Sequence, residues 1–260
     1  MSGNRKKIVS SMALVSLGWA SVGALAGDPQ TLEMPAKDRA LLDEYLGHGV
    51  VGKAVPAKPI GDPIDYVQFA TDGTYAVKIT SGEEKGRTID HSVREMHEDS
   101  EGVDWEIRAG KSDIIVLRYD KHGNIVFVHH AEPGEGDAIY SPSPPLLKKG
   151  MKPGSTDHGD FAVTIRSTED PKKIKHTGNL HLELSYLGMF ELNLPFGKHN
   201  AVLIKSAYKG KIGPAKVDDT QYRFFVENVG MVAMVERKDI SAFVVYSEHV
   251  KVGKLLVKGK

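Results

Sequence analysis

The sequence of 260 residues contains no cysteine. This absence excludes disulfides, thiolate metal ligands, cysteine nucleophiles and lipid anchors attached to cysteine. Its 34 basic and 34 acidic residues give a formal net charge of zero, so the chain as a whole lacks the positive field that holds a nucleic acid. It also lacks an apolar run of the roughly 20 residues that a membrane-spanning helix needs. What remains is a chain with 40% hydrophobic residues, an ordinary value for a folded soluble protein.

The first 26 residues have the order of a secretory signal peptide. Basic residues stand at positions 5–7, a mostly apolar stretch covers residues 8–22, and Ala24-Leu25-Ala26 supplies the small residues that signal peptidase needs. An uncleaved membrane anchor is the alternative, but the apolar stretch is short and contains Gly18 and several serines. We therefore expect cleavage after Ala26 and a periplasmic or secreted protein without a membrane span. Loss of three basic residues leaves 31 against 34 acidic ones, a net charge of −3.

Residues 27–64 predict the one helix of the chain, followed by a Pro-rich connector. Asp38 is a candidate N-cap for a helix over residues 39–46, and Gly47 is its stop signal. Prolines at positions 56, 59 and 63 then indicate an extended connector.

From residue 65 onward the apolar residues recur with the period of two that is typical of strands. The first β region, residues 65–132, contains two predicted hairpins. One pairs residues 66–70 with 75–79 around Asp72-Gly73, and the other pairs 113–119 with 125–130. Residues 133–160 are rich in Pro and Gly and predict a loop. That loop is either a boundary between two lobes or a long connection within one sheet.

The second β region, residues 161–260, alternates most clearly. Large apolar residues at even positions share one predicted core face: Leu180, Leu182, Leu184, Tyr186, Phe190, Leu192 and Leu194. Further strands are predicted at 221–227, 231–236, 240–247 and 250–257. No crossover helices separate the strands, so we predict an antiparallel arrangement. The predicted fold class is mainly β: an antiparallel meander or curved half-barrel sheet, in one or two lobes, with a short N-terminal helix.

Turn and strand motifs in the last third of the chain resemble a family of exported bacterial proteins that carry a domain of unknown function. The motifs are Leu194-Pro195-Phe196-Gly197, Ala201-Val202-Leu203-Ile204, Gly213-Pro214-Ala215, Tyr222-Arg223-Phe224-Phe225 and Val229-Gly230-Met231-Val232-Ala233. The resemblance implies an exported, curved antiparallel half-barrel similar in outline to periplasmic lipoprotein carriers. It transfers no active site, because its motifs contain no catalytic residues.

The eleven histidines suggest metal binding, but their spacing does not. His129 and His130 are adjacent, so on a strand they point to opposite faces. On one strand His91 and His97 would lie too far apart to share an ion. His176 and His181, five residues apart, would point to opposite faces. We interpret these histidines as surface residues and predict no metal ligands and no cofactor.

Carboxylates and lysines offer weaker candidates for a site. Asp104 and Glu106 lie at i, i+2 on one strand face opposite Trp105, a spacing that would suit paired-carboxylate hydrolysis or a solvated strand face. Asp218-Asp219 is predicted to lie in a turn. Lysines between positions 205 and 211, with Lys251, Lys254, Lys258 and Lys260, form either an anion-binding rim or a protected edge strand.

Three functions fit these observations, and we rank them in order. The first is a periplasmic binding or carrier protein for an apolar, lipid-like ligand, because the single short helix leaves part of the concave face uncovered and a dry pocket would result. The second is a structural or interaction module of the cell envelope that offers a sheet edge or its Pro-rich loop to a partner protein. The third is a hydrolase that uses Asp104 and Glu106. We predict no enzyme activity and no catalytic or cofactor-binding residues.

Overall fold

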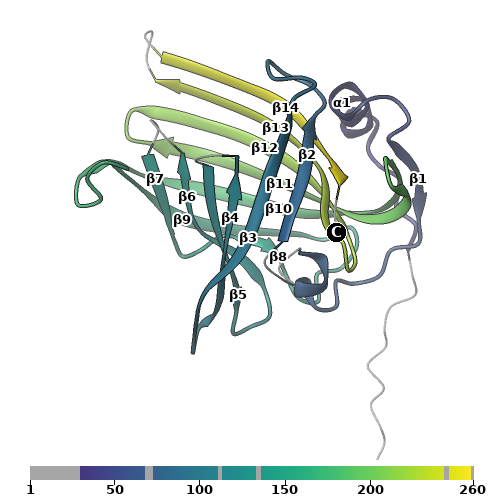
Figure 1. Cartoon of the computed structure of the whole chain (residues 1–260), viewed down its shortest axis with the longest axis horizontal. Coiled ribbons are helices and arrows are strands. Elements are labelled where there is room, and N and C mark those ends of the chain that lie inside the picture. The colour runs from purple at the N-terminus through teal and green to yellow at the C-terminus, as the bar shows by residue number, and fades with distance from the viewer. Residues whose placement is uncertain (1–29, 68–72, 111–112, 133–135, 243–245, 259–260) are drawn as a thin grey trace, which may run out of the picture.

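Figure 1 shows the computed structural model of the chain, which describes residues 30–67, 73–110, 113–132, 136–242 and 246–258. Strands make up 67% of the described residues and one short α-helix precedes them, so the predicted mainly β fold class is confirmed. The predicted signal peptide and its cleavage site after Ala26 lie outside the described residues.

Short elements come first, strands of 3–12 residues follow between residues 73 and 166, and the strands from residue 174 onward have 12–21 residues. The N-terminal part contains α1 (Ala36–Leu46), β1 (Val51–Val55) and the 3-10 turn η1 (Pro63–Tyr66). The strands that follow are β2 (Gly73–Ile79), β3 (Thr88–Asp99), β4 (Gly102–Ala109), β5 (Asp113–Asp120), β6 (Ile125–Glu132), β7 (Gly136–Ser141), β8 (Pro145–Leu147), β9 (Thr156–Arg166), β10 (Ile174–Leu194), β11 (Gly197–Ile212), β12 (Ala215–Val226), β13 (Gly230–Ala242) and β14 (Tyr246–Lys258). β10 alone has 21 residues, against about 5–6 in an average strand, so β10–β14 form one wall of long strands.

Every strand pair is antiparallel, and the sheet closes on itself. Neighbours follow chain order from β2 to β7 and from β10 to β14. β14 pairs with β2, and β9 pairs with both β7 and β10, so twelve strands form a closed barrel to which β1 and β8 add at β10 and β6. The antiparallel meander predicted in the second β region is confirmed by β10–β14, but the half-barrel prediction is wrong. The closing strands β7 and β9 start within the Pro- and Gly-rich segment that predicted a loop.

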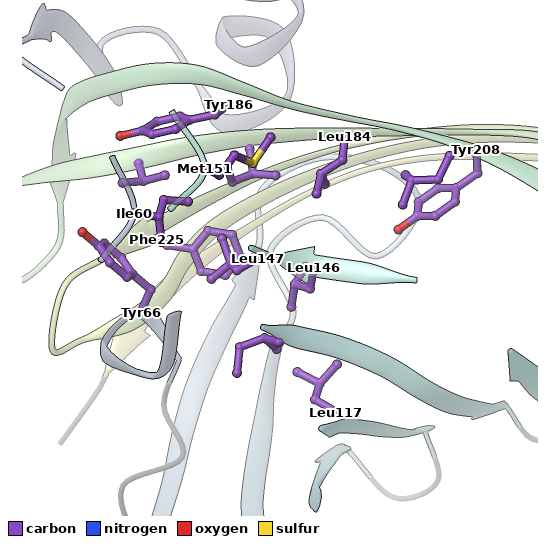
Figure 2. Close-up of a cluster of buried hydrophobic side chains, with 14 of the residues drawn as sticks. Ile60, Tyr66, Leu117, Leu146, Leu147, Met151, Leu184, Tyr186, Tyr208 and Phe225 are labelled. Carbon is purple, nitrogen blue, oxygen red and sulfur yellow. The ribbon is translucent and has the colours of Figure 1, made fainter. Parts of the chain in front are cut away.

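Two inserted segments fill part of the barrel interior. We call residues 57–66 of the connector and residues 145–151 around β8 the plug, because their apolar side chains pack against inward-facing wall residues (Figure 2). The Ile60 amide donates to the Met151 carbonyl at 2.9 Å, and the Gly150 amide donates to the Ile60 carbonyl at 2.7 Å. These bonds hold the two segments together. Leu147, which belongs to the plug, is fully buried.

α1 packs on the outer face of the long strands and not in the concavity. Leu42, Tyr45 and Leu46 share a buried cluster with wall residues such as Phe224 and Val235. Gly253 allows this close approach, because a Cβ at that position would lie 2.2 Å from the Tyr45 carbonyl oxygen.

A bulge in β10 moves the apolar residues from one face of the wall to the other. Tyr186 pairs with Ile204 and Gly188 with Leu203, so Leu187 is an extra residue in the ladder. Gly188 has a φ of 132°, a conformation that favours glycine. Leu180, Leu182, Leu184 and Tyr186 belong to the interior cluster, whereas Phe190, Leu192 and Leu194 belong to the cluster under α1. All seven are buried, but the prediction that they share one face is wrong beyond the bulge.

The two predicted hairpins have different outcomes. In the first arm predicted for the first hairpin, Tyr66 lies in η1, and residues 68–72 lie outside the described residues. The strand β2, which was its predicted second arm, pairs with β3 and β14 instead, so the first arm of this prediction is wrong. The second hairpin is confirmed by the pairing of β5 with β6. Asp120 organises its turn, because its Oδ1 accepts the amides of His122 and Asn124 at 2.9 and 2.8 Å.

Three further boundaries differ from the prediction. The segment 133–160 contains β7, β8 and the start of β9, which join one continuous sheet. The four short strands expected after residue 221 are three long ones, since β12–β14 continue through polar residues. α1 starts at Ala36 after Pro35, and Asp38 lies inside the helix, where it is buried and accepts hydrogen bonds from the Tyr222 hydroxyl at 2.7 Å and the Lys205 ammonium at 3.2 Å.

Candidate functional site

An open groove of about 420 Å³ lies where the connector meets the ends of the long strands. Its lining is mixed apolar and polar: Pro56, Lys58, Tyr66, Met189, Asn200, Val226 and Glu227. Tyr66 and Val226 are buried, at 3% and 6% exposure, and so form an apolar floor. The volume lies within the range of about 300–1,000 Å³ that small-molecule sites occupy, and the groove is open to solvent.

The groove has fixed walls and a polar rim. The Tyr186 hydroxyl donates to the Lys58 carbonyl at 3.0 Å, and the Asn228 backbone amide donates to the Asp65 carbonyl at 2.6 Å, so hydrogen bonds hold both sides. The Lys58 ammonium and the Glu227 carboxylate lie 3.2 Å apart, and both side chains are about half exposed. Burial, with the charges of Glu227 and Asp65, raises the pKa of Tyr66 to about 12. The floor therefore stays uncharged at physiological pH, while the rim carries one solvated ion pair.

The barrel interior contains a smaller apolar cavity of about 50 Å³. It is lined only by apolar and aromatic side chains: Val67, Tyr75, Val93, Ile107, Leu117, Leu146, Phe225 and Met231. This volume is well below that of a ligand site. The cavity between the plug and the wall is thus too small for the acyl chain that the predicted dry pocket would hold.

A second group of inward-facing residues is polar. On β12, Asp219, Gln221 and Arg223 alternate between the interior residues Val217 and Phe225. Their neighbours on β13 are Lys238, paired with Asp219, and Glu236, paired with Gln221. We call Asp219, Gln221, Arg223, Glu236 and Lys238 the polar cluster.

Hydrogen bonds connect the members of the polar cluster. Gln221 Nε2 donates to Asp219 Oδ2 at 2.6 Å and to Glu236 Oε1 at 3.1 Å. Burial lowers the pKa of Lys238, but its bond to Glu248 at 2.9 Å and the charge of Glu236 outweigh this effect, so the pKa is raised and the ammonium stays charged.

Asp219 is the most perturbed carboxyl group of the cluster. It is 7% exposed, and its Oδ1 has no hydrogen-bond partner among the described residues. Burial and the charge of Glu236 raise its pKa to about 7, against the opposing effect of Arg223. The prediction that Asp218-Asp219 lies in a turn is wrong, because both residues are part of β12.

The neighbouring histidines His129 and His130 face opposite sides of β6, as their adjacency predicts. His130 Nε2 points inward, 2.7 Å from Asp113 Oδ1 and 3.3 Å from Glu132 Oε1. His129 Nδ1 lies 3.4 Å from Asp137 Oδ1 on the outer face.

The other candidate histidines do not meet. His97 and His181 are exposed, each beside one aspartate, Asp99 at 3.6 Å and Asp160 at 2.8 Å, whereas His176 is exposed on β10 and faces away from His181. His91 is buried beside the Tyr75 hydroxyl at 3.1 Å, and burial lowers its pKa to about 4. The surface prediction is therefore wrong for His91, because its side chain shares the inner face of β3 with Val93.

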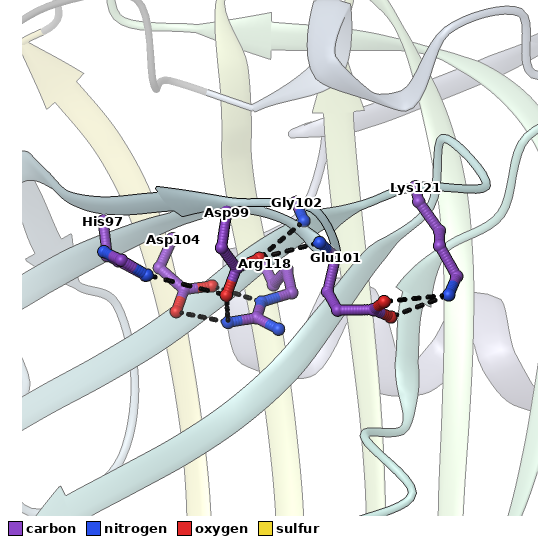
Figure 3. A network of polar contacts seen from close by, with 7 residues as sticks. All are labelled: His97, Asp99, Glu101, Gly102, Asp104, Arg118 and Lys121. Atoms are coloured by element: carbon purple, nitrogen blue, oxygen red, sulfur yellow. Dashed lines mark hydrogen bonds and ion pairs between the residues drawn. The ribbon is translucent and has the colours of Figure 1, made fainter.

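The paired carboxylates of β4 lie on the outer face, where arginines hold them; Figure 3 shows Asp104 with Arg118. Arg118 binds both oxygens of Asp104, at 2.6 and 2.8 Å. Arg94 and Arg108 each bind Glu106 in the same bidentate manner, and the Arg94 hydrogen bonds hold the pKa of Glu106 below its usual range. Hydrolysis by a carboxylate pair needs one group with a raised pKa, and Glu106 has the opposite shift.

The predicted lysine rim is divided between two faces. Lys205 contacts Asp38 of α1 and lies 5.2 Å from the centre of the Tyr222 ring, so it fixes the helix to the wall. Lys209 is exposed on the same strand, while the charge of Lys254 helps to lower the pKa of the buried His91. Lys260 lies outside the described residues.

Sequence reasoning missed the groove and the polar cluster. The groove combines residues from the connector, β10, β11 and the end of β12, which only the folded chain brings together. The polar cluster had a local signal, because polar residues alternate at 219, 221 and 223 between two apolar positions of the same parity. A strand predicted to begin at residue 221 hid that pattern.

No helix in the described part of the chain is long and apolar enough to cross a membrane. No family model and no curated protein matches the chain. Among solved structures, the chain is similar to a protein with YmcC-like fold from Bacteroides fragilis, with 12% identity and a TM-score of 0.45 over 74% of this chain and 96% of that one. It is also similar to the hypothetical lipoprotein YmcC from Escherichia coli, with 12% identity and a TM-score of 0.37 over 78% and 90% of the two chains. Similarity at this level transfers no function.

Proposed function

We propose that this chain is an exported binding protein that holds a lipid-like, amphiphilic ligand in the groove between the connector and the ends of β10–β12. The observation that carries the proposal is the volume of the groove, about 420 Å³, over the buried floor of Tyr66 and Val226. Burying one acyl chain on such a floor is favourable by roughly 0.8 kcal/mol for each methylene group. Lys58 at the rim would receive an anionic headgroup when its exposed pair with Glu227 opens.

Export is part of the proposal, and it rests on the signal-peptide pattern of residues 1–26. We expect binding without turnover, because the carboxylates Asp104 and Glu106 are held in arginine ion pairs on the outer face. An envelope interaction module has less support. Ring closure pairs each of the twelve described strands on both sides over at least part of its length, and the large exposed apolar residues Met96, Ile174 and Phe196 belong to different parts of the chain.

The proposal is tested by titrating the mature protein with a monoacyl anionic phospholipid below its micelle concentration, followed by native mass spectrometry. We expect saturable 1:1 binding that Met189→Glu weakens at least tenfold, because a charge then lies in the groove. Met96→Glu is the matched control, since Met96 is 50% exposed on β3 and lies outside the groove lining. Absence of saturable binding, or equal loss in both variants, would contradict the proposal.

A second variant tests whether Lys58 contacts the headgroup of the lipid. Lys58→Glu should weaken the anionic phospholipid more than a zwitterionic one with the same acyl chain, because the rim cation is lost. Equal effects on the two lipids would show that Lys58 does not contact the headgroup.

A further inference from the structure

We propose that Asp113, His130 and Glu132 bind one divalent transition-metal ion inside the barrel, with Zn²⁺ the ion that best matches their ligand atoms. The three residues come from the adjacent strands β5 and β6. Ile114 pairs with Ala131 and Ile115 with His130, so Asp113 and Glu132 lie one step further along the same ladder. Alternation then places all three side chains on the inner face.

The distances between the ligand atoms suit a single ion. One nitrogen or oxygen of each residue lies within 4.8 Å of the others, and His130 Nε2 is 2.7 Å from Asp113 Oδ1 and 3.3 Å from Glu132 Oε1. Zinc bound at about 2.0–2.2 Å in a tetrahedron needs its ligands roughly 3.4 Å apart. Small side-chain rotations would reach that separation. The neighbouring inward positions on β4 and β7 are Ala109 and Ala138, whose side chains leave these rotations free.

The local charge favours a cation. The interior neighbours include the carboxylates of Glu236 and Asp219, and the fields of Glu132 and Asp113 act on His130 together with that of Glu236. The nearby cations are Arg223, Lys238 and Lys254, and Glu248 binds Lys238 at 2.9 Å, so the carboxylates outnumber the cations. The buried Asp219 Oδ1 accepts no hydrogen bond from the described residues, so one interior carboxylate oxygen still lacks a donor.

The chemistry of the ligands selects the ion. One imidazole nitrogen with two carboxylates suits Zn²⁺ or Mn²⁺, whereas Ca²⁺ and Mg²⁺ prefer oxygen ligands only. The three side chains are each about one-third exposed, so an ion could enter from solvent. Three protein ligands also leave a fourth position for water or a small anion.

The test is isothermal titration of the untagged, chelator-treated protein with ZnCl₂, with Mn²⁺ and Ca²⁺ as parallel titrants. We expect one Zn²⁺ per chain, a rise in Tm with added Zn²⁺, and no measurable heat with Ca²⁺. Asp113→Asn and Glu132→Gln keep the side-chain shape and should each weaken Zn²⁺ at least tenfold, and His130→Ala should abolish stoichiometric binding.

His129→Ala is the matched control, because His129 is the adjacent residue on the opposite face and pairs with Asp137. This variant should bind Zn²⁺ like the unchanged protein. Circular dichroism shows whether each variant folds. If His130→Ala does not fold, Asp113→Asn and Glu132→Gln decide the outcome. Binding of fewer than one ion per chain, or equal loss in His129→Ala and the three site variants, would overturn the proposal.

Discussion

Buried carboxylates on the inner and outer faces of the barrel wall have pKa values shifted in opposite directions. Glu106, on the outer face of β4, has 5% side-chain exposure and is held by two arginines, and its pKa is lowered. Asp219, on the inner face of β12, is equally buried but lies beside another carboxylate, and its pKa is raised to about 7. The same chemical group is thus fixed as an anion outside and poised between two states inside. The difference shows that partners, and not burial alone, set the charge state.

The largest expected effect comes from placing a charge on the inner face where no partner exists. Leu182 is 2% exposed in the interior cluster, so Leu182→Asp should lower the free energy of unfolding by more than about 4 kcal/mol or prevent folding. Urea unfolding followed by circular dichroism measures the change. A loss below about 1 kcal/mol would show that Leu182 does not face the core.

Removing the charge of Glu106 tests the outer face. Glu106→Gln should cost about 1–3 kcal/mol at pH 7, because charge-assisted hydrogen bonds to Arg94 and Arg108 are lost. A lowered folded-state pKa means that this stability is present above the usual value of 4.5 and is lost as pH falls through the folded-state value. The gap between the two proteins, measured by urea unfolding across pH 2–8, should therefore close in acid. A gap that is independent of pH would contradict the ion-pair account.

The inner carboxyl group should show the opposite pH dependence. Because the pKa of Asp219 rises from 3.8 to about 7 on folding, folding takes up a proton between these values and stability falls as pH rises through this range. Asp219→Asn removes this penalty, so the variant should exceed the unchanged protein by about 1–3 kcal/mol at pH 8 and match it near pH 4. A variant that is less stable at pH 8 would indicate that the Asp219 anion is stabilised by a partner.

The smallest effect on stability is expected at Glu183, the residue next to Leu182. Glu183 follows Leu182 on β10 but is exposed on the outer face. Glu183→Lys should change the free energy of unfolding by less than about 0.5 kcal/mol. A larger loss, in the same urea experiment, would mean that the two faces of β10 are not distinguished as the alternation requires.

Local patterns predicted much of the fold, and non-local pairings account for most of the rest. Alternation predicted the β5–β6 hairpin and the meander of long strands, because neighbouring strands in sequence pair with one another. The closure of the barrel depends on β9 bridging β7 and β10, and no local signal encodes such a partner choice. The bulge at Leu187 was equally hidden, since one extra residue reverses the faces without changing the apolar spacing.

The candidate site was less predictable than the fold. The sequence could show that His129 and His130 point apart, but it could not show that Asp113 of the neighbouring strand lies 2.7 Å from His130. Asp104 and Glu106 were correctly placed together on one face, while their three arginine partners come partly from β3 and β5. The groove requires the connector to reach the strand ends across the barrel.

The contrast between the two faces is tested most directly by a carbon-13 NMR titration of the side-chain carboxyl groups, with Glu106→Gln and Asp219→Asn used to assign the two signals. We expect Asp219 to titrate near pH 7 and Glu106 to remain ionised below pH 4.5. Two ordinary titrations near pH 4, or a signal of Asp219 below that of Glu106, would contradict this contrast.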